Sequence, residues 1–221
     1  MNGLGAIDFR MLSFVRDTIV HSDANATELD TRFPFRNRFH HCVRVALIAV
    51  EIAEQEGADM DVAAISGIFH DSGKAAGRDH AEVSAEICRK YLTENRLFLS
   101  KIDRIVDCVR HHSAHIPFER CAYPHDLAVL RDADRLDEVG AMGITWTLLG
   151  VGSVGLKSYY DALNRLVSVH LSEDEAAWSD QMYAATGKAL IVQRVRREQR
   201  FIEELAEELG INRIHPDVWA V

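Results

Sequence analysis

A histidine and an aspartate, His70 and Asp71, stand side by side directly after an apolar stretch that ends at Phe69. If this stretch is a helix, its end presents an imidazole nitrogen and a carboxylate oxygen from one rigid point. Together they suit a borderline or hard divalent metal such as Mn²⁺, Fe²⁺, Zn²⁺ or Mg²⁺. Gly73 lets the chain turn away from the helix, and Lys74 then lies near whatever the metal holds. Taken alone, the pair also fits a surface dipeptide at a helix end.

Histidines are frequent in this chain and cluster around that pair. Six of the eleven lie between residues 40 and 112. His41 shares a helical face with Val45 and Ile48, so it points inward, either as a metal ligand or as a buried histidine bonded to a backbone carbonyl. His112 continues an apolar stripe through Val109. Both residues are therefore candidate ligands.

Two further histidines have weaker support. His80 falls in the first turn of an expected helix, where a solvated histidine is the alternative. His111 falls on the far side of the stripe that leads to His112. It could join a site only if the helix unwinds at its end, and otherwise it is an exposed residue.

An acidic run at 131–138 interrupts an otherwise apolar segment. Such runs usually form a solvated helix face. Asp134, however, faces the same way as Leu127 and Leu130, a costly place for a carboxylate without a metal or arginine partner. Asp134 is therefore a candidate ligand.

The elements that must position these residues are all helical, because apolar residues recur at three and four and no run alternates at two. Asp79 with Glu82, and Ser100 with Asp103, predict capping boxes at two helix starts. The chain predicts one all-α domain over residues 1–221. The expected helices cover residues 6–21, 37–56, a segment from Asp59 or Asp61 to His70-Asp71, 80–94, 101–112, 126–149, 156–168 and 174–209.

Composition limits the class of protein and its partners. A net charge of −9 argues against a broad nucleic-acid footprint and favours a small-molecule partner. No secretory signal and no apolar run of transmembrane length stand out, and the four cysteines show no CxxC spacing, so they are expected to be buried thiols. We therefore expect a cytoplasmic protein that does not bind a membrane.

Several motifs together resemble the HD superfamily of metal-dependent phosphohydrolases. Residues 41–46 look like its H-x-x-R-V-A opening, residues 70–74 like its H-D-x-G-K core, and residues 133–136 like its A-D-x-L closing motif. The G-x-x-G-I sequence at 140–144 is similar to that of stand-alone HD hydrolases. The resemblance covers about residues 30–150, which implies a helical HD-domain core there and a helical extension at 151–221.

The resemblance implies a ligand set for one or two divalent ions, with Mn, Fe, Zn, Mg, Co and Ni not distinguished. The implied ligands of the first ion are His41, His70, Asp71 and Asp134, with Asp132 as the alternate for the last place. His80 and His112 match the second-metal positions of some relatives, with Asp71 as the bridge, and His111 is a further candidate there. Asn37 stands where relatives that cleave cyclic dinucleotides can carry a glutamate, and no Gly-Tyr-Pro follows Lys74, which disfavours that activity.

The implied activity is hydrolysis of a phosphoester or phosphoanhydride, in which a metal lowers the pKa of water. The substrate is expected to be a phosphorylated small molecule, in particular a nucleotide. Lys74 and Arg44 are expected to contact phosphate, and Asp137 to orient a ligand histidine or a water, while Arg44 could instead form a salt bridge to Glu51 or to the acidic run. The alternatives are di-iron oxygenation on the same fold and a non-catalytic metal or nucleotide sensor.

For two segments near the C-terminus the sequence leaves two alternatives each. The glycine-rich stretch 150–155 is expected to be an interhelix loop, with a mobile lid as the lesser alternative. The last long helix packs either on the core or on a second copy of the chain, so a homodimer is possible.

Overall fold

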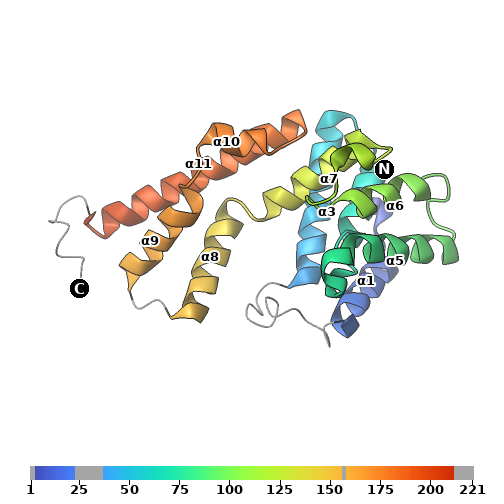
Figure 1. The fold of residues 1–221 in the computed structure, drawn as a ribbon, viewed down its shortest axis with the longest axis horizontal. Helices are drawn as coiled ribbons and strands as arrows, with labels where there is room; N and C mark the ends of the chain where they lie inside the picture. The colour runs from blue at the N-terminus through green and yellow to red at the C-terminus, as the bar shows by residue number, and fades with distance from the viewer. Residues whose placement is uncertain (1–2, 23–36, 156–157, 212–221) are drawn as a thin grey trace. The chain divides into compact units, whose positions relative to one another are not determined.

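The protein is described here from a computed structural model, which describes residues 3–22, 37–155 and 158–211 (Figure 1). The regular structure in these ranges is helical throughout, which confirms the predicted all-α class. No helix within them is both long and apolar enough to span a lipid bilayer. The helices in chain order are η1 (Gly3–Ala6), α1 (Phe9–Ser22), α3 (Arg38–Glu56), α4 (Met60–Phe69), η3 (Lys74–Asp79), α5 (His80–Glu94), α6 (Ile102–His111), η4 (Phe118–Arg120), α7 (Pro124–Asp137), α8 (Ala141–Val154), α9 (Tyr159–His170), α10 (Glu175–Asp180) and α11 (Ala185–Glu208).

The helices form two compact units, each with its own core. Unit 1 is Met1–Asp137 with Met182–Gly187, and unit 2 is Glu138–Gln181 with Lys188–Val221. Every candidate site residue from the sequence belongs to unit 1. The single domain predicted for residues 1–221, with its core at 30–150 and its extension at 151–221, stays a prediction.

Helix α4 is the central helix of unit 1. Every residue from Val62 to Phe69 is buried, as expected for a helix that is apolar on all sides. The Asp59 carboxylate starts the helix by accepting the backbone N–H groups of Asp61 and Val62, at 3.0 and 3.2 Å. Because the helix is buried along its length, the polar residues that follow Phe69, namely His70, Asp71 and Ser72, are buried as well.

Helices α3 and α4 pack at backbone contact distance. A Cβ atom added at Gly67 would lie 2.6 Å from the Cα atom of Ala46. Helix α3 itself is bounded by Asn37, whose side chain accepts the backbone N–H of His40, and by Gly57 in the left-handed conformation at φ 67°. The predicted helix 37–56 is therefore confirmed, and its tight contact with α4 sets the distance between His41 and His70.

Gly67→Ala is expected to destabilise unit 1 by about 1–3 kcal/mol, because the added methyl group overpacks the contact between α3 and α4. Denaturant unfolding followed by circular dichroism measures the change. Gly5→Ala is the matched control, since a Cβ atom there meets nothing within 4 Å, and it should stay within about 0.5 kcal/mol of the wild type. A Gly67→Ala variant as stable as the Gly5→Ala variant would contradict this packing.

Gly73 is needed for a reason other than the predicted turn. Its φ is −100°, which other residues also adopt. Its N–H donates to Oγ of Ser84 at 2.8 Å, and a Cβ atom at this position would lie 2.7 Å from the Ser84 nitrogen. Glycine therefore allows the start of α5 to approach the end of α4.

The two predicted capping boxes are wrong. Asp79 precedes α5, but its side chain accepts no cap hydrogen bond, and the residue that precedes α6 is Lys101. Glu82 and Asp103 instead pair with arginines, Glu82 with Arg110 and Asp103 with Arg89. Ion pairs between α5 and α6, which lie side by side in Figure 1, occupy these carboxylates.

Two long helices predicted from the sequence are each divided. The helix predicted at 126–149 is broken between α7 and α8, where Gly140 has a φ of 87° and donates its N–H to Oε1 of Glu198 at 2.7 Å. The helix predicted at 174–209 is broken before α11, where Asp132 accepts the N–H groups of Tyr183 and Ala184 at 2.9 and 2.8 Å. In both places a carboxylate distant in the sequence binds backbone amides at the break.

Unit 2 buries three polar side chains that contact one another, Glu198, His170 and Thr147. Glu198 Oε1 lies 3.0 Å from His170 Nδ1, and His170 Nε2 lies 2.9 Å from Thr147 Oγ1. Gly143 makes room for them, because a Cβ atom there would lie 2.7 Å from Glu198 Oε1. The stretch 150–155, expected to be a loop or a lid, is instead helical as far as Val154.

Candidate metal centre

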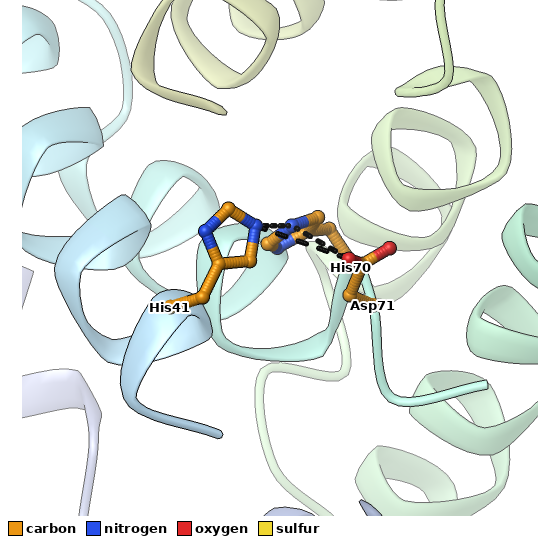
Figure 2. Close-up of side chains that lie close together, drawn as sticks. All are labelled: His41, His70 and Asp71. Atoms are coloured by element: carbon orange, nitrogen blue, oxygen red, sulfur yellow. Dashed lines mark hydrogen bonds and ion pairs between the residues drawn. The ribbon is translucent and has the colours of Figure 1, made fainter. Parts of the chain in front are cut away.

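His41, His70 and Asp71 meet inside unit 1, as Figure 2 shows. His41 comes from the first turns of α3, and His70 with Asp71 follows the last turn of α4. The Nε2 atoms of the two histidines lie 3.1 Å apart, and each lies 3.8 Å from Oδ2 of Asp71. All three side chains are buried. Two imidazoles and a carboxylate thus converge on one point, as a metal requires.

Asp134 of α7 joins this convergence. Its Oδ1 lies 3.2 Å from Nε2 of His41 and 3.6 Å from Nε2 of His70. The alternate residue, Asp132, points its carboxylate at the start of α11 instead. The structure therefore brings Asp134 to the other candidate ligands and leaves Asp132 outside. His41, His70, Asp71 and Asp134 are called the first ligand group below.

A second ligand group lies on the other side of Asp71. It consists of His80, the first residue of α5, and His112, the residue after α6, together with Asp71. The Nε2 atoms of the two histidines lie 3.2 Å apart. Oδ1 of Asp71 lies 3.4 Å from Nε2 of His80 and 3.6 Å from Nε2 of His112. Asp71 thus turns one carboxylate oxygen to each group, which is the arrangement of a bridging ligand.

The hydrogen bonds of the four histidines show that these groups suit a cation. Each Nδ1 atom lies within 2.8 Å of an oxygen that can only accept, which fixes one proton on Nδ1 and leaves Nε2 as the atom that can bind a metal. These acceptors are Asp137 Oδ2 for His41 and the carbonyl oxygens of Gly67, Gly77 and Val109 for His70, His80 and His112. Two Nε2 atoms about 3 Å apart need a proton or a metal ion between them, and the residues of each group fit a divalent metal.

The protonation of the histidines follows their surroundings. Burial lowers the pKa of His70 to about 4, and burial together with Lys74 lowers that of His80. Both rings are therefore neutral near pH 7, as metal ligands must be. Burial would also lower the pKa of His41, but its hydrogen bonds to Asp134 and Asp137 outweigh burial and raise that pKa to about 9. Without a metal, His41 therefore carries a second proton on Nε2, which a bound ion would displace.

Asp71 carries a negative charge into this buried place. Burial alone would raise the pKa of its carboxyl group, yet the neighbouring His70, His112, Lys74 and Arg38 hold it well below the usual range. Lys74 Nζ lies 3.1 Å from Oδ1, and an Arg38 nitrogen lies 2.8 Å from Oδ2. Each ligand group thus already has one cationic side chain at Asp71.

Sequence reasoning missed Arg38. A signal was available, because Arg38 precedes His41 by three residues and so shares its face of α3. Its side chain is 12% exposed. An arginine held at the edge of a buried carboxylate is placed to bind a second anion, so it joins Lys74 as a candidate phosphate contact.

Asp137 binds the Nδ1 side of the His41 ring, and Arg44 binds Asp137. Asp137 accepts Nδ1–H of His41 at 2.8 Å, and also accepts two hydrogen bonds from the Arg44 guanidinium, at 2.7 and 2.8 Å. These bonds offset burial and lower the pKa of the Asp137 carboxyl group. The Arg44 side chain is 36% exposed. Arg44 therefore pairs with the acidic run rather than with Glu51, and it acts on the site through Asp137.

The structure does not bring His111 to either ligand group. Its ring lies beside Asp107, with Nδ1 2.9 Å from the Asp107 carbonyl oxygen. Helix α6 keeps its regular form up to His111, so the two adjacent histidines leave the helix on different sides. Of the seven metal ligands expected from the sequence, the structure brings together the other six, which are Asp71 and five side chains near it.

Comparisons with known proteins agree with this geometry. Residues 38–139 match the family model of the HD domain. Over 65 residues the chain is 45% identical to ribonuclease Y from Helicobacter pylori strain J99, a match that covers 27% of this chain and only 12% of that protein. It is 24% identical over 173 residues to the uncharacterized protein YpgQ from Bacillus subtilis strain 168, covering 77% of this chain and 83% of that one.

Solved structures show the same fold. The crystal structure of Bacillus subtilis YpgQ in complex with ADP superposes with a TM-score of 0.62 at 21% identity, over 94% of this chain and 97% of that one. The crystal structure of a predicted HD superfamily hydrolase from an uncultured Thermotogales bacterium gives a TM-score of 0.62 at 22% identity, over 91% of this chain and 92% of that one. Residues 38–139, which include His41, His70-Asp71 and Asp134, therefore match an HD domain, and the solved structures share its fold.

Proposed function

We propose that this protein is a metal-dependent phosphohydrolase that cleaves a phosphoester or phosphoanhydride bond of a nucleotide. One observation carries the proposal: Asp71 points Oδ2 at one pair of facing histidine nitrogens and Oδ1 at another. His41, His70, Asp71 and Asp134 would hold one ion, and His80 and His112 would share Asp71 to hold a second. Mn²⁺, Fe²⁺, Zn²⁺, Mg²⁺, Co²⁺ and Ni²⁺ all remain candidates.

A divalent metal bound there would lower the pKa of water and offset negative charge on a phosphoryl group. The chain itself supplies the remaining parts of the mechanism. Asp137 keeps the proton of His41 on Nδ1, so that Nε2 stays directed into the site. Lys74, about a third exposed, and Arg38 bring positive charge to the same carboxylate and would bind phosphoryl oxygens. Arg44 holds Asp137 in place.

The nucleotide part of the proposal rests on two observations. Cationic side chains flank the ligand groups, and cations recognise phosphate. In addition, the YpgQ crystal structure, which has the same fold, contains ADP. The similarity to ribonuclease Y covers too little of that protein to transfer its substrate. A free nucleotide is therefore the proposed substrate, and RNA is the competing outcome of the test.

The test uses the purified chain, stripped of metal and reloaded with Mn²⁺, Mg²⁺, Co²⁺ or Fe²⁺. Nucleoside mono-, di- and triphosphates are scored for released phosphate and pyrophosphate, and a single-stranded RNA is scored for cleavage. We expect metal-dependent release from at least one nucleotide class and no cleavage of the RNA. Metal binding without turnover of any substrate would contradict the proposal and favour a non-catalytic sensor.

A second candidate function is oxygenation at a di-iron centre. The two oxygens of Asp71, each directed to a different ligand group, favour it as much as they favour two-metal hydrolysis. Iron-loaded protein exposed to air distinguishes the two functions. A visible absorption band together with substrate oxidation would support oxygenation, whereas hydrolysis that depends strictly on Mn²⁺ would exclude it.

Lys74→Ala is expected to lower kcat/KM for the nucleotide by about 10- to 100-fold, because a hydrogen bond to a charged group contributes about 1.5–3 kcal/mol. Steady-state kinetics with the best substrate of the panel measures the loss. Lys90→Ala is the matched control, since Lys90 is an exposed lysine of α5. Equal kinetics for the two variants would remove Lys74 from the phosphate site.

A further inference from the structure

Three side chains of different ligand type converge at a second place in unit 1. Asp107 and His111 lie one turn apart on α6, and Cys121 follows η4 in the segment that leads to α7. One ligand atom from each lies within 4.8 Å of the others. His111 and Cys121 are buried, and Asp107 is partly buried. This cluster shares no residue with the two ligand groups around Asp71.

Hydrogen bonds from the backbone hold two of these side chains in place. Asp107 accepts the N–H of Ala122 through Oδ2 at 2.7 Å, and its other oxygen, Oδ1, lies 3.2 Å from Nδ1 of His111. The Cys121 sulfur accepts the N–H of Tyr123 at 3.4 Å. Because Nδ1 of His111 also lies 2.9 Å from the carbonyl oxygen of Asp107, its proton is on Nδ1, and Nε2 is the nitrogen left to bind an ion.

A second buried thiol lies against the first. Cys108 is hydrogen-bonded to Cys121, and this bond together with burial raises the pKa of the Cys108 thiol well above its usual range. Cys108 therefore stays protonated and supplies a second donor to the Cys121 sulfur. The cluster thus offers one sulfur, one imidazole nitrogen and one carboxylate oxygen.

We propose that Asp107, His111 and Cys121 bind one borderline divalent ion, of which Zn²⁺ is the best match, at a site separate from the proposed catalytic centre. A sulfur ligand beside imidazole and carboxylate selects Zn²⁺ over Mg²⁺ or Mn²⁺, which prefer oxygen. Three protein ligands leave a fourth tetrahedral position for water. The site does not depend on the proposed hydrolase activity.

The position of this site gives it a structural role. An ion there joins α6 to the segment between α6 and α7, which Arg131 also holds through the carbonyl oxygens of His111, Ser113 and Ile116, at 2.6 to 3.1 Å. His112 of the second ligand group is the next residue after His111. The ion therefore fixes the end of α6 from which His112 reaches Asp71.

Cobalt substitution tests the proposal on the full chain, because a thiolate ligand gives Co²⁺ a near-ultraviolet charge-transfer band that imidazole and carboxylate do not. We expect the band in the wild type, and we expect added Zn²⁺ to remove it. Cys121→Ser and His111→Gln should each weaken or abolish it. Cys88→Ser, which removes a buried thiol of α5, should leave it unchanged.

Asp71→Asn separates this site from the proposed catalytic centre, because that variant should lose hydrolysis and keep the band. Circular dichroism of each variant confirms that it is folded. The absence of the band from the wild type, or its persistence in Cys121→Ser, would overturn the proposal whether or not the protein is a hydrolase.

Discussion

Asp71→Asn is expected to lower kcat/KM for the nucleotide about 1,000-fold or more. A metal at a phosphoryl group supplies several kcal/mol of charge stabilisation, and each 1.36 kcal/mol corresponds to a tenfold change in rate. Asp71 is the one side chain of the described site that lies in both ligand groups, with Oδ2 in the first and Oδ1 in the second. An asparagine offers one uncharged oxygen, so it can serve neither group as a bridging carboxylate does.

Elemental analysis and kinetics of the same preparation measure this effect. The variant should contain less metal than the wild type and should release phosphate at a rate close to background. Asp103→Asn is the control, since Asp103 is an 81% exposed carboxylate paired with Arg89 at the surface, and it should behave as the wild type. An Asp71→Asn protein with wild-type activity would show that the reaction takes place elsewhere.

Asp137→Asn is expected to weaken metal binding about 10- to 100-fold, the usual cost of losing the partner that orients a ligand histidine. Asp137 accepts the His41 Nδ1–H and is held by Arg44. An asparagine can turn its NH₂ group toward His41, which would favour a proton on Nε2 and so block the ligand atom. Titration of the metal-free protein with Mn²⁺ measures the affinity.

Asp126→Asn provides a matched control for that change. Asp126 is a buried carboxylate of the same helix, α7, and it is likewise held by two nitrogens of an arginine, Arg104. Its loss should cost stability and leave metal affinity unchanged. If both variants lose affinity equally, the effect of Asp137 is a general loss of packing rather than the orientation of His41.

The sequence predicts the fold class and many of the helix positions because these depend on local patterns. Apolar periodicity locates α3 and α5 closely, and Gly57 stops α3 where a left-handed residue is needed. The two divided helices could not be predicted in this way. Their breaks depend on Glu198 and Asp132, carboxylates distant in the sequence that bind backbone amides at the breaks.

The candidate site, too, depends partly on contacts between distant residues that local patterns do not predict. Helical faces predict that His41 and His112 point inward, and the structure places them so. His111, expected to be exposed if it lay outside the site, is instead buried beside Asp107. Periodicity does not predict which groups meet across helices. The contacts of Arg38 with Asp71 and of Arg44 with Asp137 join residues 33 and 93 positions apart, so their partners become visible only in the folded chain.

Metal-dependent hydrolysis is measured most directly as phosphate and pyrophosphate release by the metal-stripped protein during a stepwise addition of Mn²⁺. With the nucleotide panel as substrate, we expect no release before metal is added and a rise that saturates as the sites around Asp71 fill. Full activity in the stripped protein, or no release at saturating metal, would contradict it.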